Sequence, residues 1–100
     1  MTHPQWRLPH SHQAELHGAL DRNTVPALWQ ALQQWEPSVP QVELSLQYVQ
    51  RIDSAGMVLL LHLIEHAKKR NCHIMLSFVP EQLVMLFKLS NVEAMLAEHK

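Results

Sequence analysis

The chain has 100 residues, which is enough for one hydrophobic core but too short for a catalytic domain with a separate regulatory domain. Hydrophobic residues make up 47% of the chain and its formal net charge is -1 at pH 7. This composition excludes a disordered chain and gives no electrostatic reason to expect nucleic acid as a partner. We therefore expect a single domain over residues 1–100 whose partner is another protein.

Cysteine content and hydropathy indicate a cytoplasmic protein. Cys72 is the only cysteine, so an internal disulfide is excluded, and we expect its thiol to be buried as a small hydrophobic group. The N-terminus lacks the basic and apolar regions of a secretory leader, and the longest apolar run, from Ala55 to Leu61, is too short to span a bilayer. The sequence thus predicts a soluble chain without direct membrane insertion.

The first third of the chain predicts two strands and a helix. Residues 1–13 are rich in proline and histidine and form at best an edge strand after a loosely ordered lead-in. Residues 14–21 alternate as a strand does, and residues 21–24 supply a turn ahead of a helix that begins near Val25. Apolar residues recur along this helix at helical spacing: Val25, Leu28, Trp29, Leu32 and Trp35.

In the remainder of the chain, strands alternate with helices. Residues 41–46 and 73–78 alternate as strands with one apolar face, and a long helix should run between them from the region of Ser54 to a basic cluster at residues 68–70. Pro80 should open another helix, and residues 90–93 predict a capping box for a short last helix. The residues expected to point into the core from these strands and the Pro80 helix are Val42, Leu44, Leu46, Ile74, Leu76, Phe78, Leu83, Leu86 and Phe87.

This order of elements predicts an α/β fold. Alternation of strands and helices after a first hairpin requires crossover connections, and polar residues interleaved in every strand indicate that only one face of the sheet is covered. We expect a single domain with a mixed β-sheet of about four to five strands and with helices packed mainly on one face.

The clearest functional candidate is the strand-to-helix connection at residues 51–56, which we call the elbow. Asp53 and Ser54 provide N-cap chemistry, and Ala55 and Gly56 are small residues of the first helical turn. A side chain at Gly56 would limit how closely another surface approaches the helix start. We therefore predict that Asp53, Ser54, Ala55 and Gly56 contact a partner.

Two residues of the long helix do not fit its division into a core side and a solvent side. Val58 and Leu59 fall on the flanks of the solvent side, so either neighbouring helices cover them or they belong to a docking patch centred on Ser54, Val58 and His62. We add Val58, Leu59 and His62 to the partner-binding candidates. The predicted core stripe consists of Met57, Leu60, Leu61, Ile64 and Ala67, and the predicted solvent side of His62, Glu65, His66 and Lys69.

Trp29 is the last partner-binding candidate. Its place on the apolar stripe of the first helix would make it a core anchor. A tryptophan at the surface would instead be a typical interface hot spot. Both roles remain open from the sequence.

The segment from His62 to His66 formally matches the H-x-x-E-H pattern of one metallopeptidase class. A catalytic zinc needs a third protein ligand and an open coordination position, which this short chain does not evidently supply. Ser54 likewise lacks a base and an orienting group, so its alternative role is that of a helix cap. We expect no enzyme, no catalytic residue, no metal and no cofactor.

Three segments carry a family resemblance: residues 18–21 (Gly-Ala-Leu-Asp), residues 43–45 (Glu-Leu-Ser) and residues 52–56 (Ile-Asp-Ser-Ala-Gly) ahead of an apolar helix. Together they resemble the STAS domain, the fold of anti-sigma-factor antagonists and of the cytoplasmic tails of sulfate transporters, over a stretch from about Gly18 to Asn91. The helix itself is most similar to the small STAS subunits of phospholipid-transport ABC complexes of Gram-negative bacteria.

The resemblance implies a non-catalytic cytoplasmic subunit that binds the ATPase subunit of an ABC transporter, and through it the permease, at the cytoplasmic face of the inner membrane. Its role would be in intermembrane phospholipid transport and outer-membrane lipid asymmetry. The alternative that the resemblance implies is an anti-sigma-factor antagonist switched by phosphorylation of Ser54, which follows the aspartate as in that branch. Antagonists usually have an aspartate at the position of Glu43, and this departure removes part of their acidic site.

Overall fold

The computed structural model describes residues 3–89. The capping box and short helix predicted at residues 90–93 and beyond lie outside the described residues. Within them the order of elements is the predicted one. The elements are β1 (Trp6–His10), β2 (Gln13–Leu20), α1 (Val25–Leu32), β3 (Gln41–Ile52), α2 (Ser54–Lys68), β4 (His73–Ser77) and α3 (Glu81–Leu89).

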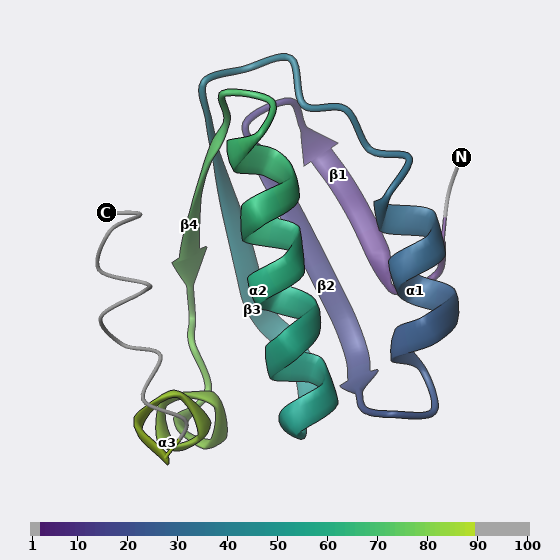
Figure 1. Cartoon of the computed structure of the whole chain (residues 1–100), viewed down its shortest axis with the longest axis vertical. Helices are drawn as coiled ribbons and strands as arrows, with labels where there is room; N and C mark the ends of the chain where they lie inside the picture. The colour runs from purple at the N-terminus through teal and green to yellow at the C-terminus, as the bar shows by residue number, and fades with distance from the viewer. Residues whose placement is uncertain (1–2, 90–100) are drawn as a thin grey trace.

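The strands form one four-stranded mixed sheet in the order β1-β2-β3-β4. β1 is an edge strand antiparallel to β2, whereas β2 with β3 and β3 with β4 are parallel pairs. α1 and α2 lie side by side on the same face of the sheet, and α3 lies beyond the end of β4 (Figure 1). The α/β class, the mixed sheet and the one-sided packing of helices are confirmed.

The core lies between the sheet and the two helices that cover it. The inward residues of β3 are those predicted, with Val42, Leu44 and Leu46 each at most 2% exposed. Burying a leucine side chain contributes about 1.5–3 kcal/mol, so the buried residues between the sheet and the helices are a major source of the free energy of folding. The largest fully buried side chains are Leu16, Leu20, Leu28, Leu32, Leu44, Leu46, Leu59, Leu60, Leu63, Leu83 and Val42.

The end of α2 is set by Asn71, directly after the predicted basic cluster. Asn71 has a φ of 59°, a left-handed conformation that asparagine tolerates better than most residues. The N–H of Cys72 then donates to the carbonyl of Ala67 at 2.9 Å, and the N–H of Asn71 to that of Lys68 at 3.0 Å. These are the paired bonds of a Schellman motif, which returns the chain toward β4. Cys72 is buried, and burial raises the pKa of its thiol.

Three boundaries differ from the sequence-based expectation. β3 continues past Leu46 to Ile52, and α1 ends at Leu32, so Trp35 lies in the following loop, where its ring meets that of Trp6 edge-on at 5.3 Å. Phe78, expected to point inward, is 62% exposed. β4 ends at Ser77 and Phe78 has a φ of 54°, which breaks the strand alternation before the side chain can turn to the core.

Candidate functional site

The elbow forms where β3 ends and α2 begins, and Asp53 is its N-cap. One carboxylate oxygen of Asp53 accepts hydrogen bonds from the backbone N–H of Ala55 at 2.8 Å and of Gly56 at 3.2 Å. The backbone N–H of Asp53 donates to the carbonyl of Leu20 at the end of β2, at 3.2 Å. The helix start is thus fixed both to its own cap and to the neighbouring strand.

Ser54 is the first residue of α2 and its side chain is exposed. Because Asp53 caps the helix, the hydroxyl of Ser54 is not needed for capping, and within residues 3–89 it makes no hydrogen bond that the structure identifies. The alternative that Ser54 is only a helix cap therefore loses its basis. A small polar group stands free at the positive end of a helix.

Gly56 does not face a partner, which corrects the sequence-based interpretation. It is buried, and a Cβ atom built on it would meet the carbonyl oxygen of Leu20 and lie 2.6 Å from Cγ1 of Ile52. The close approach that requires a glycine is therefore the approach of α2 to β2 within the domain. Gly56 therefore allows the start of α2 to pack closely against the end of β2.

Leu59 was also misplaced, because it is 1% exposed and belongs to the core. Gly56, Leu59 and Leu63 lie on one stripe at helical spacing, and the tight seat of Gly56 turns that stripe toward the sheet. Val58 is 44% exposed, so neighbouring helices do not cover it. Ala55 is partly buried.

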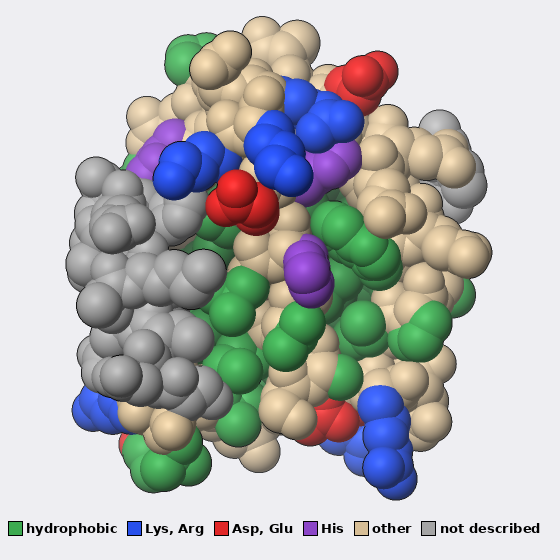
Figure 2. All heavy atoms as spheres, viewed as in Figure 1, with side chains coloured by type: hydrophobic (Ala, Val, Ile, Leu, Met, Phe, Trp, Pro, Cys, Tyr) green, Lys and Arg blue, Asp and Glu red, His purple; other side chains and the backbone are tan. Residues whose placement is uncertain are grey.

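Ser54, Val58 and His62 form an exposed stripe along α2, each residue one turn beyond the last. Trp29 of α1 lies beside it, partly exposed, with its ring centroid 5.7 Å from that of His62. Figure 2 shows hydrophobic side chains gathered on this side of the molecule, with histidine among them. We call Ser54, Val58, His62 and Trp29 the α1–α2 face.

Trp29 is neither fully buried nor fully exposed. One side of it packs against the core, and its ring also meets His66 edge-on at 6.0 Å. The remaining part of the side chain is accessible at the surface. Trp29 is therefore a partial core anchor that contributes to the α1–α2 face.

The two histidines of the H-x-x-E-H segment have different surroundings. Nε2 of His66 lies 2.7 Å from the carbonyl oxygen of Trp35, and its Nδ1 lies 3.3 Å from a guanidinium nitrogen of Arg70. His62 is exposed on the α1–α2 face. Among the residues that the structure describes, no group of three or more His, Cys, Asp and Glu side chains could hold a metal ion.

An ion pair next to the elbow was not found from the sequence. Oδ2 of Asp21 lies 2.7 Å from a guanidinium nitrogen of Arg51, and Oδ1 accepts bonds from the backbone N–H groups of Asn23 and Thr24. The Arg51 bond, with these two, holds the pKa of the Asp21 carboxyl below its usual range, although burial acts in the opposite sense. The ion pair connects the turn after β2 to the end of β3.

Glu43, the position at which the chain departs from the antagonists, lies far from Ser54. Its N–H donates to the carbonyl of His12 at 2.8 Å, near the start of β3, whereas the elbow follows Ile52 at the end of that strand. At about 3.3 Å per residue the two ends are roughly 30 Å apart. The carboxylates near the elbow are those of Asp21 and Asp53.

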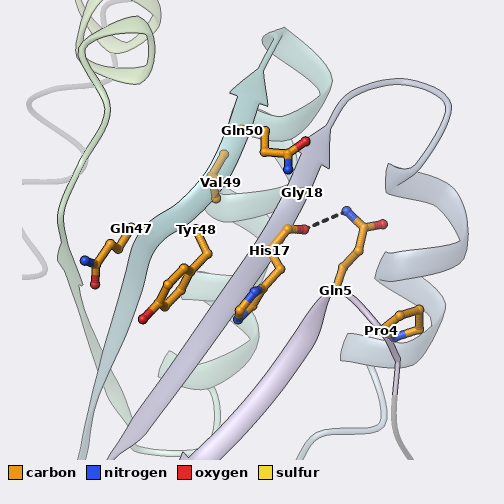
Figure 3. Close-up of a pocket in the computed structure, with 8 residues that line it drawn as sticks. All are labelled: Pro4, Gln5, His17, Gly18, Gln47, Tyr48, Val49 and Gln50. Atoms are coloured by element: carbon orange, nitrogen blue, oxygen red, sulfur yellow. Dashed lines mark hydrogen bonds between the residues drawn. The ribbon is translucent and has the colours of Figure 1, made fainter.

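A hollow of about 560 Å³ lies on the face of the sheet that α1 and α2 do not cover (Figure 3). His17 and Tyr48 stack across it with ring centroids 4.6 Å apart, and Nε2 of His17 lies 2.9 Å from a carboxylate oxygen of Glu15. The amide of Gln5 donates to the carbonyl of His17 at 2.9 Å. None of the predicted site residues lines this hollow.

The part of the chain that the structure describes has no helix of the length and apolarity needed to cross a bilayer.

Solved structures with this arrangement include a sulfate transporter family protein from Wolinella succinogenes, with 24% identity and a TM-score of 0.66, covering 93% of this chain and 78% of that one. The anti-sigma factor antagonist SpoIIAA in its unphosphorylated form has 16% identity and a TM-score of 0.64, covering 85% of this chain and 81% of that one. Identities this low show the fold alone, which is that of a STAS domain.

Sequence comparisons identify a family within the STAS domains. A family model described as "Mlab, STAS domain" matches residues 7–97. The intermembrane phospholipid transport system binding protein MlaB of Escherichia coli (strain K12) is 35% identical over 79 residues, which are 79% of each chain, and its Shigella flexneri counterpart gives the same values. The chain therefore belongs to the MlaB family of STAS domains.

Proposed function

We propose that this protein is the non-catalytic STAS subunit of an Mla-type ABC transporter, in which it binds and supports the ATPase subunit, MlaF. Membership in the MlaB family supports the assignment to the phospholipid transport system, since the relatives carry that system in their names. Through the ATPase subunit it would join the permease at the cytoplasmic face of the inner membrane. Its function would be to support intermembrane phospholipid transport and outer-membrane lipid asymmetry.

The observation that carries the choice of docking site is the exposed, unused hydroxyl of Ser54 at a rigidly held helix start. Asp53 takes over the capping, so Ser54 is free to meet a partner. Val58 and His62 extend the accessible surface along α2, and Trp29 supplies a large side chain of the type that dominates binding energy at interfaces.

The proposed site residues divide into two groups. Ser54, Ala55, Val58, His62 and Trp29 would contact the partner directly. The position of α2 would be held by Asp53, which caps the helix, and by Gly56 and Leu59, which are buried on its inner side.

A pull-down from detergent-solubilised membranes tests the assignment. Tagged protein should recover an ABC ATPase together with its permease, and a Ser54→Asp variant purified in parallel should recover neither. If the parent protein recovers neither the ATPase nor the permease, the assignment to a transporter is contradicted.

The second candidate is an anti-sigma-factor antagonist switched by phosphorylation of Ser54. Exposure of the serine hydroxyl favours access by a kinase, and a phosphate would suit the positive end of α2. The neighbouring Asp53 carboxylate opposes it, and Arg51 is already paired with Asp21. Recovery of a soluble histidine-kinase-like ATPase in the same pull-down would decide for this candidate.

A further inference from the structure

The ring of His62 is available to a partner, whereas that of His66 is not. Both nitrogens of His66 have neighbours, the carbonyl of Trp35 at 2.7 Å and the guanidinium of Arg70 at 3.3 Å. Among residues 3–89 the structure identifies no hydrogen bond from His62, whose contact is the ring of Trp29 at 5.7 Å. A partner that buries His62 must therefore supply its polar contact, because an unpaired buried polar group costs free energy.

Positive groups extend along the same side of α2. Lys69 lies two turns beyond His62 on the exposed stripe, and Lys68 and Arg70 beside it are also exposed. Figure 2 shows Lys and Arg side chains gathered at this end of the helix, with one acidic side chain below them. At the other end, the helix start presents the positive pole of the helix dipole beside Ser54.

Few negative groups oppose these cations near His62. α1 (Val25–Leu32), the helix packed beside it, contains no titratable side chain. On α2 the one nearby carboxylate is that of Glu65, one turn along. The carboxylate of Asp53 lies at the other end of α2, where its Oδ1 caps the helix. The face is apolar at Val58 and Trp29, and toward the end of α2 the cations of Lys68, Lys69 and Arg70 outnumber the carboxylate of Glu65.

We propose that the segment of the ATPase subunit that docks on α2 is amphipathic and acidic, with an apolar side against Val58 and Trp29 and a carboxylate opposite His62. Charge complementarity then sets the direction of the segment along α2, since its acidic end must lie toward Lys69. This inference rests on the proposed function and adds the chemistry of the partner surface. His62 is the residue that distinguishes an acidic partner segment from a neutral one.

Opposite charges at one position provide the test. Lysine and glutamate have similar helix propensities and position 62 is exposed, so His62→Lys and His62→Glu should both fold with nearly the parent's melting temperature. Affinity for the purified ATPase subunit is then measured at low and high salt. His62→Lys should bind at least as tightly as the parent, and His62→Glu should bind at least about tenfold more weakly. Raising the salt concentration should reduce this difference.

The controls are His12→Lys and His12→Glu, in the exposed turn after β1 and outside the α1–α2 face, which should both bind within about twofold of the parent. Equal weakening by Lys and Glu at position 62 would overturn the proposal, because an apolar partner surface rejects either charge. Tighter binding by His62→Glu would overturn it in favour of a basic partner. If the parent itself does not bind the ATPase subunit, the proposed function fails and the inference fails with it.

Discussion

The elbow and the hollow on the other face of the sheet both involve β2 and β3, but they are held in different ways. At the elbow, backbone groups are fixed by the Asp53 cap and by the bond to Leu20, and the exposed hydroxyl is left over. In the hollow, the register of β2 with β3 shifts on either side of His17, and the side chains there bond one another. The elbow thus leaves the hydroxyl of Ser54 without a hydrogen bond on a rigid frame, whereas in the hollow the side chains of His17 and Gln5 are bonded within the domain.

The largest expected effect is a difference in stability loss between substitutions of the chain's two glycines, one of which lies in each region. Gly56→Ala should cost about 3 kcal/mol, because the new methyl group has no room against Leu20 and Ile52. Gly18→Ala in the hollow should cost about 1–2 kcal/mol, because only its φ of 80° opposes the substitution and the nearest atom lies 3.5 Å away. Urea unfolding of both variants measures the difference. Equal losses would mean that α2 is not seated tightly on β2.

The aromatic side chains of the two regions, Trp29 and Tyr48, should also differ in the effects of their substitution. Trp29→Ala should cost about 2 kcal/mol of stability, less than for a fully buried tryptophan, and should also weaken binding of the ATPase subunit. Tyr48→Ala in the hollow loses the stack on His17 and should cost about 0.5–1 kcal/mol with binding unchanged. Thermal unfolding and affinity measured on the same samples check both. A Tyr48 variant with impaired binding would move the docking surface to the other face of the sheet.

Within the elbow, substitution of the helix cap and substitution of the proposed contact residue should have different effects on stability. Asp53→Ala should cost about 1 kcal/mol, since it removes the acceptor of two backbone N–H groups. Ser54→Ala should change stability by less than about 0.5 kcal/mol, because the hydroxyl of Ser54 does no capping. Urea titrations of the two variants are sufficient. A larger loss for Ser54→Ala than for Asp53→Ala would reverse the assignment of the cap.

The smallest effect concerns acid stability. Arg51 holds the pKa of Asp21 below its usual value of about 3.9, so the folded state binds this proton less readily than the unfolded state. The stabilisation is therefore present above about pH 4 and is lost as the pH falls through the lower folded-state pKa. Arg51→Gln should reduce the acid-induced loss of stability, and Arg22→Gln, an exposed control, should not. Unfolding followed between pH 5 and 2 tests this.

The sequence predicted the fold because its local signals agreed with the tertiary structure. Alternation in β3 identified Val42 and Leu44 as core residues, and the elbow was recognised from residue types that commonly begin helices. His62 was correctly predicted to be exposed, whereas the sequence left open whether Val58 is covered by a neighbouring helix. Each of these features depends on neighbours within a few residues along the chain.

The errors come from contacts between segments distant in the sequence. Leu59 and Gly56 were assigned to the surface because helical periodicity alone does not reveal that β2 receives the helix start so closely. The pairing of Asp21 with Arg51 depends on the parallel register of β2 and β3, which places their ends together. Glu43 lies near the start of β3, at the opposite end of that strand from the elbow.

The central claim is that Ser54 marks the docking point, and the affinity of Ser54→Asp for the ATPase subunit tests it most directly. Aspartate at the first helical position suits the helix dipole, so the variant should melt at or above the temperature of the parent. In a docked complex it adds volume and a charge without a partner, which should weaken binding by about a hundredfold or more. Ser54→Thr should bind best among substitutions at this position, and Ser11→Asp, in an exposed turn, should bind as the parent does. Parent-like binding by a folded Ser54→Asp variant would contradict the account.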